Sequence, residues 1–247
     1  MNVDIIIPAH NPGLYLRDAL NSCMDQTHKD YHIYVIDDCS DEDIMSLVEI
    51  YKKITYLRTP KNLGPGGARN YGIVRGDGEL ISFLDSDDIW MPSKLELSVK
   101  EFLFNKSIGM TCGNYQRLVN RKTVCNPFYR RPPKIDWEHL MKINYVASGS
   151  VTVRRSVLED IGMFREDIWI GEDHDLWLRI SQKYPIQYID RILYHYSVVD
   201  DGKSLTSNKK MQEAHEGVGD LIRQESLEKM NELNRAAANN SNQNLSS

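Results

Sequence analysis

The chain has few cysteines, no long apolar run and no excess of positive charge. Its four cysteines form no CxxC pair and no spacing typical of metal ligands, so we expect small buried residues or free thiols in a reducing compartment. No apolar run approaches the roughly 18–20 residues of a membrane span, and the first residues lack the basic-then-apolar pattern of a signal peptide. The formal net charge of −5 disfavours nucleic acid as a partner. These absences predict a cytoplasmic enzyme, with peripheral association at the inner face of the membrane left open.

The first hundred residues alternate between two kinds of pattern. Short apolar runs at 3–9, 31–38, 54–59 and 78–85 are typical of strands that are covered on both faces. Helical patterns follow at 11–26 and 41–53, and a glycine loop entering a helix follows at 64–76. Strands that alternate with helices predict an α/β fold with a Rossmann-like, mostly parallel sheet flanked by helices.

Polar residues follow all four predicted strands at their carboxyl ends. In an open parallel sheet these ends lie at one edge, where ligands bind. Folding alone does not account for so many polar groups at one edge, so a ligand cleft is expected there. The residues are His10 and Asn11, Asp37 and Asp38, Asn62 and Gly64, and Asp85 to Asp88.

Three carboxylates close together follow the fourth strand, at Asp85, Asp87 and Asp88. Asp88 is the best candidate for a helix cap, with Ser93 as the alternative, because a helix is predicted to start near Pro92. If the chain stays extended, Asp85 and Asp87 share one face. Two hard oxygen donors suit Mg²⁺ or Mn²⁺, with phosphate oxygens and water completing the coordination shell. We therefore predict a metal that holds a diphosphate.

Other residues of this edge fit a nucleotide. Asp38 can accept the ring N–H of uracil, thymine or guanine; alternatively, residues 37–43 are only a turn with a helix cap from Ser40 or Asp41. Glycines at 64–67 allow a ligand to approach the backbone closely. This segment lacks the GK[ST] ending of a P-loop, which excludes that class of ATPase and GTPase.

Five motifs together resemble those of family 2 glycosyltransferases, the inverting enzymes of the GT-A fold. They are IIIPAHN, VIDDCSDE, NLGPGGARNYGI, FLDSDDIWMP and GEDHDLWLRI, and the resemblance covers about residues 1–205. It implies a nucleotide-diphosphate sugar donor, with UDP favoured and dTDP and GDP left open, and a DxD metal site at Asp85 and Asp87. Donor contacts are expected from the residues of these motifs on the nucleotide side: Pro8, His10, Asn11, Asp38, Asn62, Gly66, Arg69, Asp85 and Ser86.

The resemblance also implies an acceptor side. It places a general base at Asp173, with Glu172, Ser148 and Gly149 nearby. At about 100° per residue, Asp173 shares a helix face with Trp177 and Ile180, whereas the i+4 spacing pairs Asp175 with Arg179 in an exposed ion pair. Alternatively, Asp173 merely caps the helix.

The end of the chain departs from the family pattern. His195 is predicted as a third metal ligand or a phosphate contact, or else as a packing residue, and Ser197 stands where an arginine is frequent. We expect a catalytic domain at 1–205, with a nucleotide-sugar half at about 1–93 and an acceptor half at about 94–205. Residues 206–247 are expected to form a helical extension, a possible site of homo-oligomer contact, and a polar tail.

The sequence therefore predicts inverting sugar transfer to a hydroxyl of a carbohydrate, lipid-linked or protein acceptor, in cell-surface polysaccharide or glycoconjugate synthesis. One alternative is a degenerate transferase that only binds nucleotide sugars, which would not need the intact Asp173. A phosphotransfer receiver domain also has an acidic pair after an early strand. It would leave the FLDSDD motif unexplained, and the sequence supplies no receiver lysine in context.

Overall fold

A computed structural model of the chain describes residues 1–119, 122–124, 135–198, 219–232 and 235. Residues 125–134 lie outside this description, as do the polar tail and most of the stretch that joins it to the domain.

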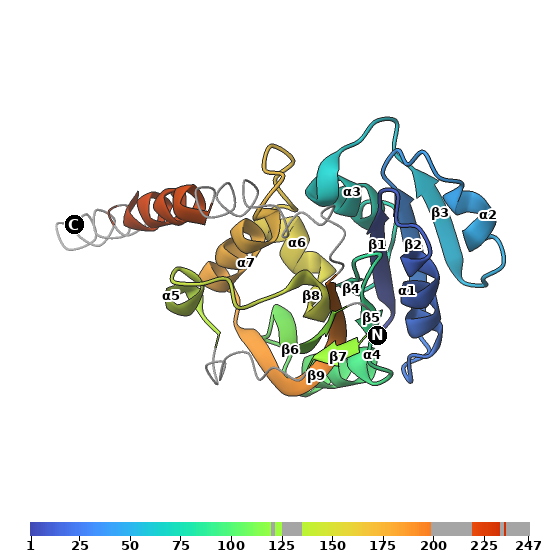
Figure 1. The fold of residues 1–247 in the computed structure, drawn as a ribbon. Coiled ribbons are helices and arrows are strands. Elements are labelled where there is room, and N and C mark those ends of the chain that lie inside the picture. The colour runs from blue at the N-terminus through green and yellow to red at the C-terminus, as the bar shows by residue number, and fades with distance from the viewer. Residues whose placement is uncertain (120–121, 125–134, 199–218, 233–234, 236–247) are drawn as a thin grey trace.

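One sheet runs through the described residues, with strand order β3-β2-β1-β4-β8-β6-β9-β5 and with β7 paired to β6 (Figure 1). The strands are β1 (Val3–Ala9), β2 (Tyr31–Asp37), β3 (Ile54–Arg58), β4 (Leu80–Phe83), β5 (Ile89–Trp90), β6 (Met110–Val119), β7 (Lys122–Val124), β8 (Thr152–Arg154) and β9 (Ile186–Val198).

The helices are α1 (Tyr15–Met24), α2 (Ile44–Val48), α3 (Gly64–Ile73), α4 (Lys94–Phe104), α5 (Trp137–Leu140), α6 (Arg155–Ile161) and α7 (Glu172–Lys183), together with a 3₁₀ turn η1 (Ser148–Ser150). Residues 219–232 form a further helix.

The predicted α/β class is confirmed, and its parallel part is the first half of the chain. Strand β1 pairs in parallel with β2 and β4, and β2 pairs in parallel with β3. The second half is mixed, because β8 runs antiparallel to both β4 and β6 while β6 and β9 are parallel. The carboxyl ends of β1 to β4 therefore lie at one edge, as the alternation predicted.

The sheet is covered on both faces because its strands are apolar on both sides. Along β1, Ile5 and Ile7 belong to one hydrophobic cluster, with Leu16 of α1, while Ile6 belongs to the other, with Ala68 of α3. This period-two division is the pattern that strand geometry requires. Helices α3, α6 and α7 pack on the second face, and α1 and α4 pack on the first.

Two segments depart from the expected lengths. The helix predicted over 41–53 is confined to α2, which ends at Val48; Lys53 has a φ of +66°, which a continuing helix does not allow. The helix at 219–232 extends away from the sheet past α7 (Figure 1). Its Ile222 is 1% exposed and belongs to the cluster that contains Ile6 and Ala68. Glu225 Oε2 lies 2.5 Å from Arg165 Nη1. No described helix is long and apolar enough to cross a membrane.

Candidate active site

The polar residues predicted at the ends of the parallel strands do meet. His10 Nδ1 donates to the Asp38 carbonyl at 2.8 Å, and the backbone N–H of Asn11 donates to Ser40 Oγ at 2.9 Å. Asn62 Nδ2 lies 3.4 Å from His10 Nδ1. Loops that follow three different strands thus form one polar edge, which confirms the clustering, while the proposed donor contacts of these residues remain predictions.

The acidic pair after β2 is buried and bonded inside the protein. Asp38 is 4% exposed, and its carboxylate accepts from Thr59 Oγ1 at 2.8 Å and from the Leu63 N–H at 2.9 Å. Burial alone would raise the pKa of Asp37, but hydrogen bonds from Tyr56 and Ser40 hold that pKa below its usual value. The two aspartates therefore hold the edge together, and a nucleobase N–H would have to share an oxygen of Asp38 with these donors.

The helix after residues 37–43 is capped by a residue other than the two predicted. Helix α2 has Asp43 as its N-cap, whose side chain accepts from the Ser46 N–H, rather than Ser40 or Asp41. Ser40 Oγ instead accepts the hydrogen bond from the Asn11 N–H described above.

The acidic segment after β4 is a turn, so the extended geometry expected from Asp85 to Asp87 is wrong. The N–H of Asp88 donates to the Asp85 carbonyl at 3.1 Å, which folds the chain over Ser86 and Asp87. Burial and the nearby Asp85 raise the pKa of Asp87 to about 6. The same causes, burial and the charges of Asp87 and Asp85, raise the pKa of Asp88 well above its usual value.

The prediction that Asp88 caps the following helix is wrong. Asp88 is 1% exposed and accepts from the Ser197 N–H of β9 at 2.8 Å through Oδ1. Ser93 is the N-cap of α4, without a side-chain cap bond. The other oxygen of Asp88 is buried without a hydrogen-bond partner. Asp88 thus anchors β9 to the acidic turn, a long-range contact that local spacing does not reveal.

Arg69 joins the acidic turn to the first turn of α7. It is 3% exposed and donates to Asp85 Oδ1 and to Glu172 Oε1, each at 2.7 Å. Burial raises the pKa of Glu172 to about 7; Arg69 opposes that rise and Asp173 adds to it. Glu172, predicted for the acceptor, is in this structure a buried partner of Arg69.

The glycines at 64–67 lie inside α3, not in a loop before it, and their space is filled by protein. A Cβ at Gly66 would meet the Arg165 carbonyl and Glu172 Cγ at 3.3 Å, and a Cβ at Gly67 would meet Leu63 at 2.7 Å. At these two positions the absent side chain makes room for other parts of the protein, and a donor contact at Gly66 stays a prediction. Gly66 allows α3 to approach the segment before α7 closely enough for Arg69 to reach Glu172.

Asp173 lies on the side of α7 that faces η1. Ser148 Oγ donates to Asp173 Oδ2 and Asn144 Nδ2 donates to Oδ1, each at 3.3 Å. Trp177 on the same helix face is 0% exposed, so the inward orientation inferred from helical periodicity is confirmed. Asp173 Oδ1 also accepts the N–H of His174 at 2.6 Å, so the carboxylate contributes to the start of the helix as well.

The pairing of Asp175 with Arg179 is confirmed, but the pair is not exposed. Asp175 is 4% exposed, and its Oδ2 lies 2.7 Å from Arg179 Nη2. Arg179 also donates to the carbonyls of Ile161, Gly162 and Met163. Asp175 thus holds a guanidinium that ties α7 to the end of α6.

The chemistry of the carboxylates in the acidic turn fits a divalent cation. Asp85 and Asp87 supply two hard oxygen donors, burial and the like charge of Asp85 raise the pKa of Asp87, and a buried oxygen of Asp88 has no partner. Among the described residues, no three His, Cys, Asp or Glu side chains are grouped to hold a metal. His195 of β9, which is paired with Ile89 of β5, thus does not complete such a group.

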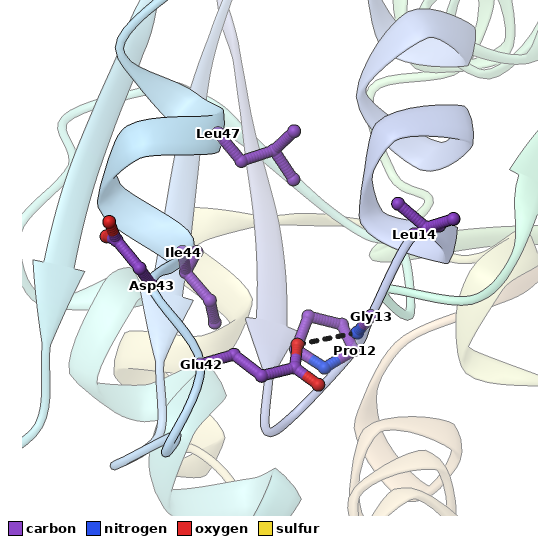
Figure 2. Close-up of a pocket in the computed structure, with 7 residues that line it drawn as sticks. All are labelled: Pro12, Gly13, Leu14, Glu42, Asp43, Ile44 and Leu47. Atoms are coloured by element: carbon purple, nitrogen blue, oxygen red, sulfur yellow. Dashed lines mark hydrogen bonds between the residues drawn. The ribbon is translucent and has the colours of Figure 1, made fainter.

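A hollow lies beside the polar edge, between the loops that lead into α1 and α2 (Figure 2). Its volume is about 260 Å³, and the Gly13 N–H donates to Glu42 across it at 2.8 Å. None of the predicted site residues lines it; the lining residues are Pro12, Gly13, Leu14, Glu42, Asp43, Ile44 and Leu47.

Sequence reasoning missed Asn144 and the surroundings of Gly149. The Gly149 carbonyl accepts from Trp90 Nε1 at 2.8 Å, and a Cβ at Gly149 would meet the Tyr194 ring at 2.7 Å. These contacts join residues that are about 45 to 60 positions apart in the chain. Neither periodicity nor motif spacing contains a signal for them.

Comparison with known proteins identifies the family. The family model described as Glycosyl transferase family 2 matches residues 4–162. A putative teichuronic acid biosynthesis glycosyltransferase of Bacillus subtilis, TuaG, is 28% identical over 214 residues, which are 84% of this chain and 82% of that protein. The Escherichia coli WfgD, a UDP-Glc:alpha-D-GlcNAc-diphosphoundecaprenol beta-1,3-glucosyltransferase, is 29% identical over 224 residues, 89% of this chain and 86% of WfgD.

The fold has a counterpart among solved structures. Residues 1–349 of Staphylococcus aureus TarS, crystallised with UDP, match with a TM-score of 0.68 and 24% identity, over 80% of this chain and 61% of that one. Two Rickettsia relatives are longer still, since the chain spans 32% and 30% of them. With more than half of its residues matched by the family model and its sheet superposable on TarS, the chain belongs to glycosyl transferase family 2 and has the GT-A fold.

Proposed function

We propose that the chain transfers a sugar from a nucleotide-diphosphate donor, UDP-linked, to an acceptor hydroxyl with inversion of configuration. The observation that carries the proposal is the Arg69 bridge. It ties Asp85 of the acidic turn to Glu172, the residue next to Asp173. A donor diphosphate at the acidic turn would therefore lie beside a carboxylate that can take a proton.

Asp173 is the proposed general base. It accepts the acceptor's hydroxyl proton as that oxygen bonds to the anomeric carbon, and the bond from this carbon to the diphosphate breaks on the opposite face. The nucleoside diphosphate leaves with the bonding electron pair. Ser148 and Asn144 each donate to one oxygen of Asp173 and so fix the orientation of its carboxylate.

Asp85 and Asp87 are the residues that would hold Mn²⁺ or Mg²⁺. Such a cation, when bound, stabilises the negative charge that builds on the leaving diphosphate. Arg69 donates to Asp85 Oδ1 at 2.7 Å and keeps that carboxylate in place. His195 remains a candidate for a contact to phosphate rather than a third protein ligand.

The relatives support the biological setting of this proposal. TuaG is named for teichuronic acid biosynthesis, and WfgD for transfer to a diphosphoundecaprenol-linked sugar. We propose a similar role here, in cell-surface polysaccharide synthesis with a lipid-linked acceptor at the inner face of the membrane. We further propose residues 1–205 as the catalytic domain, with the donor on 1–93 and the acceptor on 94–205.

The test is a donor panel. Nucleotide sugars with UDP, dTDP and GDP are incubated with the protein and Mn²⁺ or Mg²⁺, and release of the nucleoside diphosphate is measured. Thermal shift on the same panel reports binding, because a ligand that binds only the folded state raises its apparent stability. Binding of a UDP-sugar without release in any condition, acceptors included, would favour the binding-only alternative.

A further inference from the structure

Lys94, the first residue of α4, is a buried amine that the proposed reaction does not use. It is 0% exposed, and Nζ donates to the Val151 carbonyl and to Thr152 Oγ1, each at 2.9 Å, and also to Ser82 Oγ. These three acceptors are uncharged. Burying an ammonium group among neutral partners is costly, and burial lowers the pKa of Lys94 well below its usual value.

Trp90 lies against the same amine and reaches the same segment. Lys94 Nζ is 4.2 Å from the centre of the Trp90 ring, and Trp90 Nε1 donates to the Gly149 carbonyl at 2.8 Å. Trp90 and Lys94 thus hold three residues of one turn, Gly149, Val151 and Thr152. The turn is closed internally by the Val151 N–H, which donates to the Ser148 carbonyl at 2.9 Å.

This turn carries the side chain that contacts the candidate base. Ser148 begins η1, and its Oγ donates to Asp173 Oδ2 at 3.3 Å. From the other side of the turn, the Tyr194 ring fills the space beside Gly149 and leaves no room for a Cβ. The position of Ser148, and through it the orientation of the Asp173 carboxylate, therefore depends on Lys94 and Trp90.

We propose that Lys94 and Trp90 are positioning residues, which fix the turn at 147–152 so that Ser148 holds Asp173 in the orientation needed for proton transfer. The proposal rests on the proposed function of Asp173. Misplacing a reacting group by about 1 Å typically costs on the order of 100-fold in rate, so a loosened turn lowers turnover even when the fold and the donor site are intact.

The experiment uses Lys94→Met, which keeps an unbranched side chain one atom shorter and without its hydrogen bonds, and Trp90→Phe, which keeps an aromatic ring without Nε1–H. Release of UDP from the sugar donor that the panel selects gives kcat and KM per mole of folded protein. We expect kcat to fall about tenfold or more in Lys94→Met, and severalfold in Trp90→Phe, while the donor KM stays within twofold. In the Asp173→Asn background, Lys94→Met should cause no further loss.

Arg155→Met is the matched control. Arg155 also donates to two backbone carbonyls, Gly78 and Ile73, but its third partner is Asp4 near the start of β1, away from η1. This variant should lose stability and keep the wild-type kcat per folded molecule.

Wild-type kcat in both Lys94→Met and Trp90→Phe would overturn the proposal, as would a loss in Lys94→Met that adds in full to that of Asp173→Asn. Wild-type turnover in Asp173→Asn would overturn the base assignment and this proposal together. Failure of the positioning proposal alone is therefore distinguishable from failure of the assignment of Asp173 as the base.

Discussion

The three aspartates of the acidic turn differ in what balances their charge. Asp85 is paired with Arg69 at 2.7 Å, Asp88 accepts one N–H from Ser197, and Asp87 has a pKa raised to about 6 by burial and by Asp85. The pKa of Asp87 predicts how cation binding depends on pH.

Cation-dependent donor binding should weaken as the pH falls below about 6. Asp87 is then protonated, and a cation must displace that proton, so the apparent affinity should drop about tenfold per pH unit below the pKa. Calorimetry with a UDP-sugar and Mn²⁺ between pH 5 and pH 7.5 measures this. A nucleotide sugar is used because the terminal phosphate of UDP itself titrates near pH 6.

Asp87→Asn is the control, and it should show weak cation-dependent binding at every pH.

Without a cation, the free energy of unfolding should depend on pH in the direction opposite to that of a usual aspartate. Because the folded-state pKa lies above 3.8, the folded protein binds the proton more tightly than the unfolded chain, so stability is lost as the pH rises from about 4 through about 6. Equal cation-dependent affinity at pH 5 and pH 7 would contradict the role of Asp87.

A second residue-scale prediction concerns Asp175. Asp175→Asn should lower the free energy of unfolding by about 3 kcal/mol, the scale for removing one partner of a buried ion pair, because Arg179 is left without its carboxylate. Urea unfolding measures the loss. The local i+4 spacing alone predicts only a few tenths of a kcal/mol, so a loss that small would show that the pair is effectively solvated.

At the scale of elements, the sequence predicted the strands better than the contacts between them. Apolar runs located β1 to β4 because burial on both faces leaves a continuous local signal. The glycines at the start of α3 were interpreted through a ligand, whereas a Cβ at Gly64 or Gly66 would meet the segment before α7, about 100 residues further along the chain. The burial of Asp88 was missed for the same reason, since its partner Ser197 is 109 residues away.

Gly66→Ala tests the close approach of α3 to α7. Alanine should stabilise an unconstrained helix position by about 1 kcal/mol, but at Gly66 the new Cβ would lie 3.3 Å from the Arg165 carbonyl and from Glu172. We expect a net loss of stability and a lower kcat, because Arg69 and Glu172 are forced apart. Urea unfolding and donor turnover measure the two effects.

Gly219→Ala is the control for that substitution. It lies in the helix at 219–232, where only the flexible Arg223 side chain approaches, at 3.3 Å. This change should be neutral or stabilising. A Gly66→Ala protein that is stabilised to the same degree would show that α3 has room for a side chain.

At the scale of the whole molecule, the proposed site lies where the two halves of the chain meet. Arg69 and Asp85 come from the parallel half, and Glu172 and Asp173 come from α7 in the mixed half. The motifs predicted a set of site residues, and their roles stay predictions. They did not predict that a buried arginine joins the two groups, because that contact depends on how the halves pack.

The measurement that tests the account most directly compares transfer and binding in Asp173→Asn. The amide keeps nearly the same shape and remains a hydrogen-bonding side chain, with one acceptor oxygen in place of two, but it cannot take the acceptor's proton. We predict wild-type affinity for the UDP-sugar with Mn²⁺, and a kcat lowered by about 100-fold or more, the scale expected when a general base is lost. Turnover equal to that of the wild-type protein would contradict the assignment of Asp173 as the base.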